Sequence, residues 1–337
     1  MNYVKLRYFT TILVPLICML FNIPDISASE LVTKIEQYES TYSNGTSRYQ
    51  FKLLTIATLS NITIDGLKVA ELSGLAWDED ENLLYALSDN GYLLHLRPVF
   101  KNTRLTDVLF LKGYSLRDKN NRILKYKEAD SEGLVVKQGN NNLQGDSRLI
   151  VSFERIPRLV EYKTDGTFIE EIPLPAELSD IHSYQGENRA LETVTIHNEL
   201  GIITGPEFPL ITQPTKNSLD IYSLDGKHWS YPVHNAHYGA LVGMTTMPDG
   251  SILALERSYG GIIPVTDITL HRLVLDNSKS GETEIYTFDS DNGLLNENFE
   301  GITRYKENTY FMVNDDNNHP LKRTTLVYFS ITVKQDH

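Results

Sequence analysis

Cysteine is almost absent from this chain of 337 residues, in which Cys18 is the only one. A single cysteine excludes an internal disulfide and the cysteine clusters of structural zinc sites. Because stray thiols are a liability in oxidising compartments, this scarcity fits a protein of the periplasm or the cell exterior. Stability must then come from a packed core rather than from covalent cross-links.

Long hydrophobic runs are missing as well. The apolar stretch Tyr8–Phe21 follows Lys5 and Arg7 and is too short to span a bilayer. It is followed by Ile26-Ser-Ala28, which offers small residues where a signal peptidase cuts. We expect residues 1–28 to be a secretory signal, which leaves a periplasmic or secreted protein without a membrane anchor.

Positive charge is scarce: 31 lysines and arginines face 44 aspartates and glutamates, and the net charge is −13. Such a balance argues against nucleic acid as a partner, because phosphate backbones are bound through basic surfaces. An acidic field attracts cations instead. A divalent metal or a cationic ligand is therefore the expected partner, and a single monomeric domain is the favoured organisation for this length.

Several catalytic motifs are absent too. The chain has no Gly-x-Ser-x-Gly elbow, which argues against an α/β-hydrolase triad. It has neither a His-Glu-x-x-His zinc motif nor a glycine-rich phosphate loop. Any chemistry must therefore come from residues that the fold gathers from distant parts of the sequence.

What the chain does contain is a fivefold internal repeat. Short apolar segments recur at steps of 50 to 60 residues and align on Gly74, Gly133, Thr193, Gly243 and Gly301. After each comes a second apolar run, at 83–87, 149–153, 202–204, 252–255 and 310–313. Third runs follow at 93–96, 158–162, 219–224, 268–273 and 325–329, and turn signals such as Asp165-Gly166 separate them. Periods of this length indicate stacked supersecondary units.

A fourth strand is readable in four of the repeats, at 106–111, 167–174, 228–233 and 283–288. The last repeat lacks one, and the run Tyr49–Leu59 can fill its place and close the ring, which removes exposed sheet edges. The predicted fold is an all-β propeller over residues 49–337 with five four-stranded blades, six being the alternative count. Residues 29–48 are expected to be a lead-in of low order without a strand, and 114–126 an extra hairpin.

Acidic residues recur at fixed places in the repeats. Glu132, Glu192 and Glu300 occupy one register at the starts of the innermost strands, where Ser73 and Val242 stand in the other two repeats. A second set follows the next strands: Asp89, Glu154, Glu207, Glu256 and Asp315. Equal register would direct these side chains to one end of the central channel.

Two interpretations of these acids remain open. Repeat-related carboxylates repel one another unless a hard cation such as Ca²⁺ or nearby arginines compensate them, and Arg155, Arg189 and Arg257 are available. Alternatively, the acids accept backbone N–H bonds at blade turns and carry no chemistry.

Seven short motifs in order resemble a known family. They are Leu72-Ser-Gly-Leu-Ala-Trp77 through Leu84–Gly91, Asp130-Ser-Glu-Gly-Leu134, Val151–Arg158, Asn188-Arg-Ala-Leu-Glu192, Glu207-Phe-Pro-Leu210, Leu253-Ala-Leu-Glu-Arg257 and Asn298-Phe-Glu-Gly301. Together they resemble the phytase-like family described as "esterase-like activity of phytase". The sequence departs from the family pattern at Leu191-Glu-Thr-Val, where Phe-Glu-Gly-Leu is usual, but the glutamate is kept.

The resemblance implies a secreted bacterial β-propeller that hydrolyses esters or phosphoesters of small molecules. On this basis we expect a divalent metal, Ca²⁺ foremost, held by Glu132, Glu192, Glu300 and Asp315. The expected catalytic residues are Glu154 or Glu256 as general base, with Arg155 or Arg257 holding an anionic group. Arg189, Glu207 and Asp89 are the expected substrate-binding residues. The alternative function is a non-catalytic propeller that binds a ligand or partner at the envelope.

Overall fold

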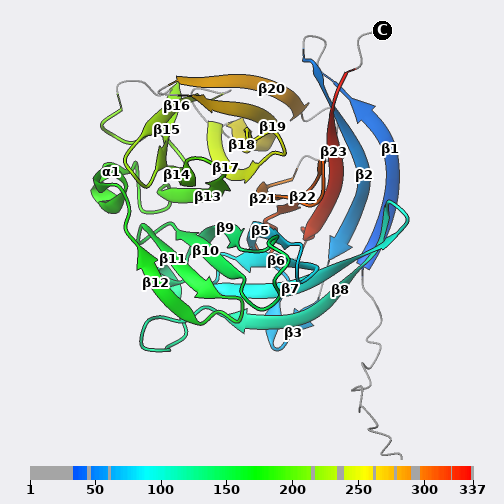
Figure 1. Ribbon diagram of the computed structural model, residues 1–337, viewed down its shortest axis with the longest axis horizontal. Helices are drawn as coiled ribbons and strands as arrows, with labels where there is room; N and C mark the ends of the chain where they lie inside the picture. Colours follow the sequence, from blue (N-terminus) through cyan, green and yellow to red (C-terminus); the bar gives the residue numbers. More distant parts are fainter. Residues whose placement is uncertain are drawn as a thin grey trace, which may run out of the picture. The chain divides into compact units, whose positions relative to one another are not determined.

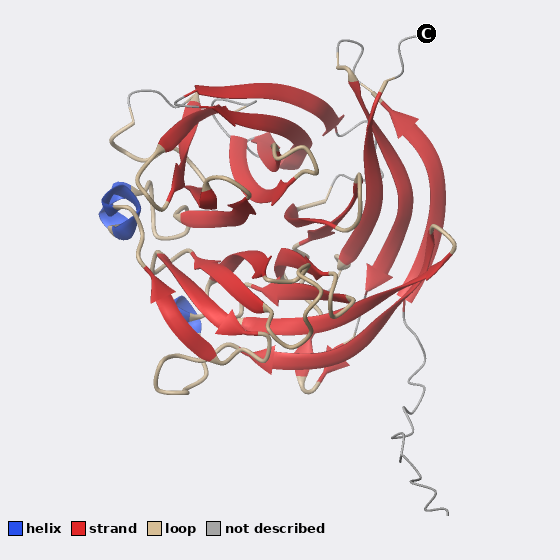
Figure 2. Ribbon diagram, viewed as in Figure 1, coloured by secondary structure: helices blue, strands red, loops and turns tan. Residues whose placement is uncertain are grey.

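The computed structural model describes residues 33–43, 47–59, 62–213, 217–233, 239–260, 263–276, 279–289, 297–319 and 321–334. The predicted signal segment 1–28 lies outside these residues. Almost every described element is a strand, and the helices are short turns: α1 (Ala176–Ser179), η1 (Tyr126–Glu128) and η2 (Ile181–Ser183) (Figure 2). In the described part of the chain, no helix has the length and apolar character needed to cross a membrane.

The strands form five antiparallel blades arranged as a propeller (Figure 1). Blade 1 contains β5 (Leu72–Asp78), β6 (Leu83–Ser88), β7 (Tyr92–Lys101) and β8 (Arg104–Ser115). Blade 2 contains β9 (Ser131–Lys137), β10 (Arg148–Phe153), β11 (Arg158–Lys163) and β12 (Phe168–Ile172). Blade 3 contains β13 (Leu191–His197), β14 (Gly201–Pro206), β15 (Ser218–Ser223) and β16 (His228–Pro232).

Blade 4 contains β17 (Gly239–Thr246), β18 (Ile252–Gly260), β19 (Ile263–Asp276) and β20 (Lys279–Asp289). Blade 5 contains β21 (Phe299–Arg304), β22 (Thr309–Asn314), β23 (Thr325–Val333), β2 (Tyr49–Leu59) and β1 (Thr33–Tyr42). A small hairpin, β3 (Thr63–Ile64) and β4 (Leu67–Lys68), precedes blade 1. The five-blade count and the four-strand repeat are thus confirmed.

The innermost strands are mostly buried because each is packed between its neighbours in the ring, and β9 is the most exposed of them. All seven residues of β5 are buried, and β21 contacts β5 to complete the circle. The recurring glycines make this approach possible. A Cβ atom on Gly74 would lie 2.7 Å from the carbonyl oxygen of Glu132, and one on Gly243 would lie 2.5 Å from that of Glu300. The repeat spacing of glycine therefore reflects close packing between blades.

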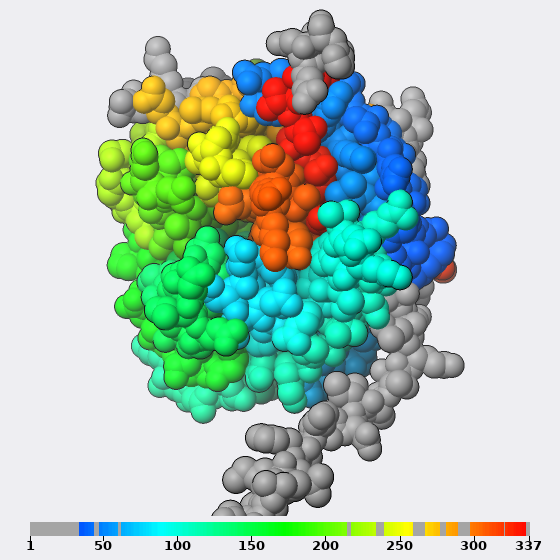
Figure 3. All heavy atoms as spheres, turned by 45° about the vertical axis from the view of Figure 1, so that its right-hand side comes forward, coloured from blue at the N-terminus to red at the C-terminus, as the bar shows by residue number. Residues whose placement is uncertain are grey.

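The ring closes as the sequence predicts, through pairing of the two ends of the propeller. β2 pairs with β23 in antiparallel register from Tyr49 opposite Val333 to Thr58 opposite Thr325. The N-terminal strands and the C-terminal strand lie side by side in the space-filling view (Figure 3). The C-terminal blade therefore combines segments almost 300 residues apart in the sequence.

The expected absence of a strand in residues 29–48 was wrong for the part that is described. Residues 33–42 form β1, which pairs with β2 and adds a fifth strand to blade 5. Its polar sequence gives little indication of a strand, because an edge strand is covered on one side only. Tyr38 and Tyr42 are packed against the core between blades 4 and 5, and the amide of Gln37 donates to the Leu105 carbonyl oxygen at 2.6 Å.

The hairpin predicted for residues 114–126 is present between blades 1 and 2. Arg117 and Ile123 form an isolated antiparallel bridge, and Asp118 Oδ1 accepts the Arg122 N–H at 2.9 Å. The segment continues through η1 to Ala129, which lies against Gly91 of blade 1. Residues 116–129 are called the insert below.

Candidate functional site

Each innermost strand has a β-bulge near its start, and this bulge determines where the side chains of the site point. In blade 3, Leu191 pairs with Pro206 and Thr193 with Gly205, so Glu192 is the extra residue. The same shift occurs in the innermost strand of all five blades, at its second residue in four of them and at its fourth residue in β17. The residues at the shifts are Ser73, Glu132, Glu192, Val242 and Glu300. A bulge redirects the side chain of its extra residue, so three glutamates leave the alternating pattern of their strands at equivalent places.

A second set of side chains lies one residue beyond the second strand in four blades, and at the equivalent position within the longer β18 in blade 4. The pairing at the bulge aligns Ser88, Phe153, Pro206, Glu256 and Asn314. The following residues are therefore equivalent: Asp89, Glu154, Glu207, Arg257 and Asp315. In blade 4 the equivalent of the acids is thus Arg257, and Glu256 stands one place earlier. A shift of one residue sends a side chain to the opposite face of a strand.

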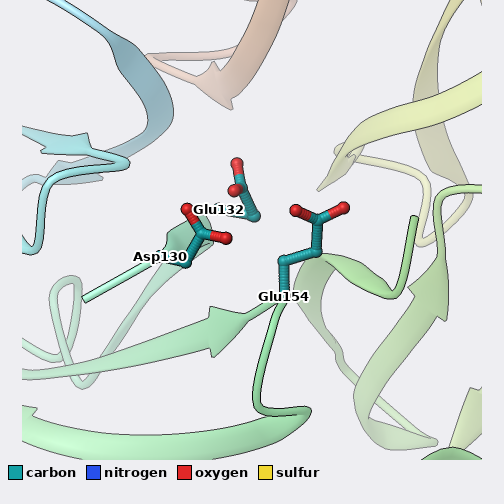
Figure 4. Close-up of side chains that lie close together, drawn as sticks. All are labelled: Asp130, Glu132 and Glu154. Atoms are coloured by element: carbon teal, nitrogen blue, oxygen red, sulfur yellow. The ribbon is translucent and has the colours of Figure 1, made fainter. Parts of the chain in front are cut away.

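Two triads of carboxylates come together at this end of the ring. Ligand oxygens of Asp130, Glu132 and Glu154 lie within 4.8 Å of one another, and so do those of Glu154, Glu192 and Glu207. Figure 4 shows the first triad, in which the three side chains converge from blade 2. Glu154 belongs to both triads, and the five residues together are called the acidic cluster.

Burial and mutual repulsion raise the pKa values of the acidic cluster. Burial, with Glu207 and Asp130 nearby, raises the pKa of Glu154 to about 8. Burial is also the main cause that raises the pKa values of Glu132 and Glu192 well above the ordinary range, and neighbouring carboxylates add to it. Without a compensating cation, burial and repulsion thus favour the protonated forms of these carboxyl groups.

Arg257 organises the neighbouring side of the site. Its Nη2 donates to Glu207 Oε1 at 2.7 Å, and its Nη1 forms an ion pair with Glu300 and donates to Asn298 Oδ1 at 2.8 Å. The Asn298 amide donates to Glu300 at 2.9 Å and to Asp315 at 3.2 Å. Glu300 and Asp315 therefore belong to an arginine-centred network, while Glu132 and Glu192 belong to the triads.

The remaining predicted residues surround the acidic cluster or lie apart from it. Arg155 Nε donates to Asp130 Oδ2 at 2.6 Å. Asp89 lines a cavity of about 600 Å³ together with Asp130 and Arg155, and burial, followed by repulsion from Glu71, raises the pKa of Asp89 to about 8. Arg189 is exposed and lies over the Phe208 ring, next to Glu207.

Glu256 is the predicted residue that the structure does not bring to the others. Its carboxylate accepts the Tyr231 hydroxyl at 2.7 Å, and His271 Nε2 is 3.6 Å away. These partners come from β16 and β19, on the other face of β18 from Arg257. Glu256 therefore contributes a buried hydrogen bond between blades 3 and 4.

Two polar residues of the site were missed as candidates, although the motifs contain them. Asp130 and Asn298 each stand two places before a bulge glutamate, and Glu71 has the same place before Ser73. Asp130 completes a triad and Asn298 bridges Glu300 to Asp315. The sequence could have indicated Asp130 and Asn298, because a polar residue stands two places before the bulge residue in three of the five repeats.

Comparisons with known proteins bear on the family. Raptor from Chaetomium thermophilum has 12% sequence identity, with a TM-score of 0.38 over 89% of this chain and 28% of that one. No match was found among curated proteins. The phytase-like family, described as "Esterase-like activity of phytase", matches residues 67–318. Because that match covers most of the chain and includes the whole acidic cluster, this protein belongs to the phytase-like family.

Proposed function

We propose that this protein is a hydrolase of ester or phosphoester bonds that depends on a divalent cation, Ca²⁺ foremost, held by the acidic cluster. The observation that carries the proposal is Glu154, which is shared by two carboxylate triads. One buried carboxylate with four acidic neighbours is costly unless a cation joins them. Membership of the phytase-like family supports the hydrolytic class.

The donor set fits a hard cation. All its side-chain ligands are carboxylate oxygens, which is the chemistry that Ca²⁺ prefers, and Ca²⁺ binds oxygens at about 2.3–2.6 Å. Oxygens on one ion are then separated by no more than about 5 Å, and each triad lies within 4.8 Å. When bound, the ion would supply Lewis acidity toward an ester or phosphoryl oxygen.

The protein's own residues would perform the other tasks. We assign Glu154 to the cation rather than to proton transfer, because it is common to both triads. Arg155, half-buried at the edge of the acidic cluster, would orient an anionic substrate group. Asp89 lines the adjoining cavity with a raised pKa, and its carboxyl group would donate or accept the proton near neutral pH.

The test combines cation binding with turnover. In Glu154→Gln we expect calcium affinity by calorimetry to fall at least about tenfold, and hydrolysis across aryl esters, phosphomonoesters, phosphodiesters and lactones to fall with it. Glu171→Gln, on the exposed face of β12, is the matched control and should change neither. Tight calcium binding without turnover of any substrate would favour the binding propeller, and unchanged binding in Glu154→Gln would remove the cation site.

Export is a separate proposal, supported by the sequence pattern of residues 1–28. We expect the mature protein to begin at Ser29, to be found in the periplasm or medium, and to be a monomer. N-terminal sequencing of the protein recovered from fractionated cells, together with light scattering, tests all three points. A retained N-terminus in the cytoplasmic fraction would contradict export.

A further inference from the structure

The cavity of about 600 Å³ beside the acidic cluster has two unlike walls. One wall is formed by Asp89, Asp130 and Arg155, next to the carboxylate triads. The other wall is the insert, which contributes Leu124, Lys125, Tyr126, Lys127 and Ala129. A volume of this size accommodates a small molecule, so the insert determines what approaches the site from this side.

Tyr126 is presented to this cavity at an energetic cost. It is 91% exposed and is the most exposed large hydrophobic side chain in the described part of the chain. Its backbone has φ of 54°, a left-handed conformation that is unfavourable for an aromatic residue. Because the ring is exposed, its packing contributes no stabilisation that would offset the strained backbone.

The surrounding contacts hold the insert in place. The N–H of Ala129 donates to the Tyr126 carbonyl oxygen at 2.9 Å. Lys127 forms an ion pair with Glu187, and the Arg158 guanidinium donates to the carbonyl oxygen of Glu128. These contacts connect the insert to blade 2 and to the loop before blade 3. The exposed ring of Tyr126 is therefore carried on a fixed support, as a contact surface for a ligand requires.

Charge indicates what this wall receives. Lys125 is exposed and has no ion-pair partner among the described residues, whereas Lys127 is paired with Glu187. Of the two lysines of the insert that line the cavity, Lys125 is thus the one without an ion pair among the described residues, and it stands beside the exposed ring of Tyr126. A lysine binds an anionic group through its ammonium, and a tyrosine ring binds a flat aromatic group by stacking.

We propose that this cavity binds an anion carrying a flat aromatic ring, with the ring stacked on Tyr126 and the anionic group between Lys125 and Arg155. The proposal rests on the proposed hydrolase function. Given that function, aryl esters and aryl phosphates are the preferred substrates. Tyr126 and Lys125 are specificity-determining residues in this account. Alkyl esters of the same charge would lack the ring contact.

The test uses two ligands that cannot be hydrolysed, phenylphosphonate and methylphosphonate, with the full chain in the presence of Ca²⁺. By calorimetry we expect the phenyl compound to bind about fivefold or more tightly, which is the effect of one ring–ring contact. Tyr126→Gly should abolish this preference without lowering the melting temperature, because glycine adopts positive φ freely. Lys125→Gln should weaken both ligands by about two- to threefold.

Ile123→Ala is the matched control: it lies on the same insert, is 46% exposed and does not line the cavity. It should change neither affinity. Equal binding of the two phosphonates by the unmodified protein, no binding of either, or a preference that survives in Tyr126→Gly would overturn the inference. Aryl ester turnover in those cases would leave the hydrolase proposal standing. Tyr126-dependent phenylphosphonate binding without turnover of any substrate would support the cavity and refute the hydrolase.

Discussion

At the scale of single residues, Arg257 is the positive counterpart of a ring of acids. It takes the place that carboxylates occupy in the other four blades, and it contacts Glu207 of blade 3 and Glu300 of blade 5. Burial raises the pKa of Glu300 to about 7 even though the guanidinium of Arg257 opposes this shift. Arg257 therefore lowers the pKa values of two buried carboxyl groups, Glu207 and Glu300, and so favours their ionised forms against the effect of burial.

Removal of this guanidinium should destabilise the protein in a pH-dependent way. In Arg257→Met, Glu207 and Glu300 lose their partner, and we expect the free energy of unfolding near pH 8 to fall by about 3–5 kcal/mol. The loss should be smaller near pH 5, because both carboxylates can then be protonated in the folded protein. Urea titrations at the two pH values measure the difference.

Arg272→Met is the matched control. Arg272 pairs with Asp249 at 2.7 Å, but the Asp249 side chain is about half exposed, so the pair is worth at most about 1 kcal/mol. Equal losses in the two arginine variants, or a loss in Arg257→Met that does not depend on pH, would show that Arg257 acts only through packing.

At the scale of the strand, the bulge at the start of each innermost strand is the decisive element. It lets Glu132, Glu192 and Glu300 converge with side chains from the second strands. It also requires neighbouring blades to approach closely just after the bulge, where Gly243 faces the carbonyl oxygen of Glu300.

We expect Gly243→Ala to test this close approach. The added methyl group would lie 2.5 Å from the backbone oxygen of Glu300, so β17 and β21 must separate. Overpacking of this kind costs about 1–3 kcal/mol, to be measured by thermal or urea unfolding. Gly281→Ala on the outer strand β20 of the same blade is the control, since its nearest neighbour, Val274 Cβ, would lie 3.9 Å away. A cost in Gly281→Ala that matched the cost in Gly243→Ala would contradict the explanation.

The strands of the repeat could be predicted from sequence, but their exact register could not. Apolar runs and turn residues predicted four strands in each of the first four repeats and three in the last, and β2 was found because the last repeat lacked its fourth strand. The bulges cannot be recognised from the alternation of apolar and polar residues, because one extra residue moves all the following side chains of the strand to the opposite face. For this reason Glu256 was aligned with the acids, although ladder pairing gives that place to Arg257.

Membership in the acidic cluster was predictable only in part for the same reason. Glu132, Glu154, Glu192 and Glu207 meet as their repeat positions suggest. Which acids join the triads and which join the Arg257 network depends on the blade that carries the arginine. Repeat spacing does not predict this, because it depends on which side chains are neighbours in the folded structure. The strand β1 escaped prediction because an edge strand needs few apolar residues, as its sequence from Thr33 to Tyr42 shows.

At the scale of the whole molecule, the site gathers carboxyl groups in a protein whose net charge is already −13, so the rest of the protein supplies no excess of positive charge to compensate them. Burial raises the pKa of Asp89 and of Glu154 to about 8, and the pKa of Glu300 to about 7. Ordinary values for these acids are 3.8 to 4.5. Between about pH 4.5 and 8, the folded protein thus holds more protons than the unfolded chain, and stability must fall as pH rises through this window.

Without divalent cations, we therefore expect the melting temperature to fall by at least about 5 °C between about pH 5 and pH 8.5, which corresponds to a loss of a few kcal/mol. Excess Ca²⁺ should raise the melting temperature strongly at pH 8.5 and little at pH 5, because carboxylates bind the ion only when they are ionised. Calorimetric scans in EDTA and in Ca²⁺ provide the measurement, and Glu154→Gln should flatten both dependences. A melting temperature in EDTA that rises with pH, or a calcium effect equal at both pH values, would mean that proton and cation binding are not linked through the acidic cluster.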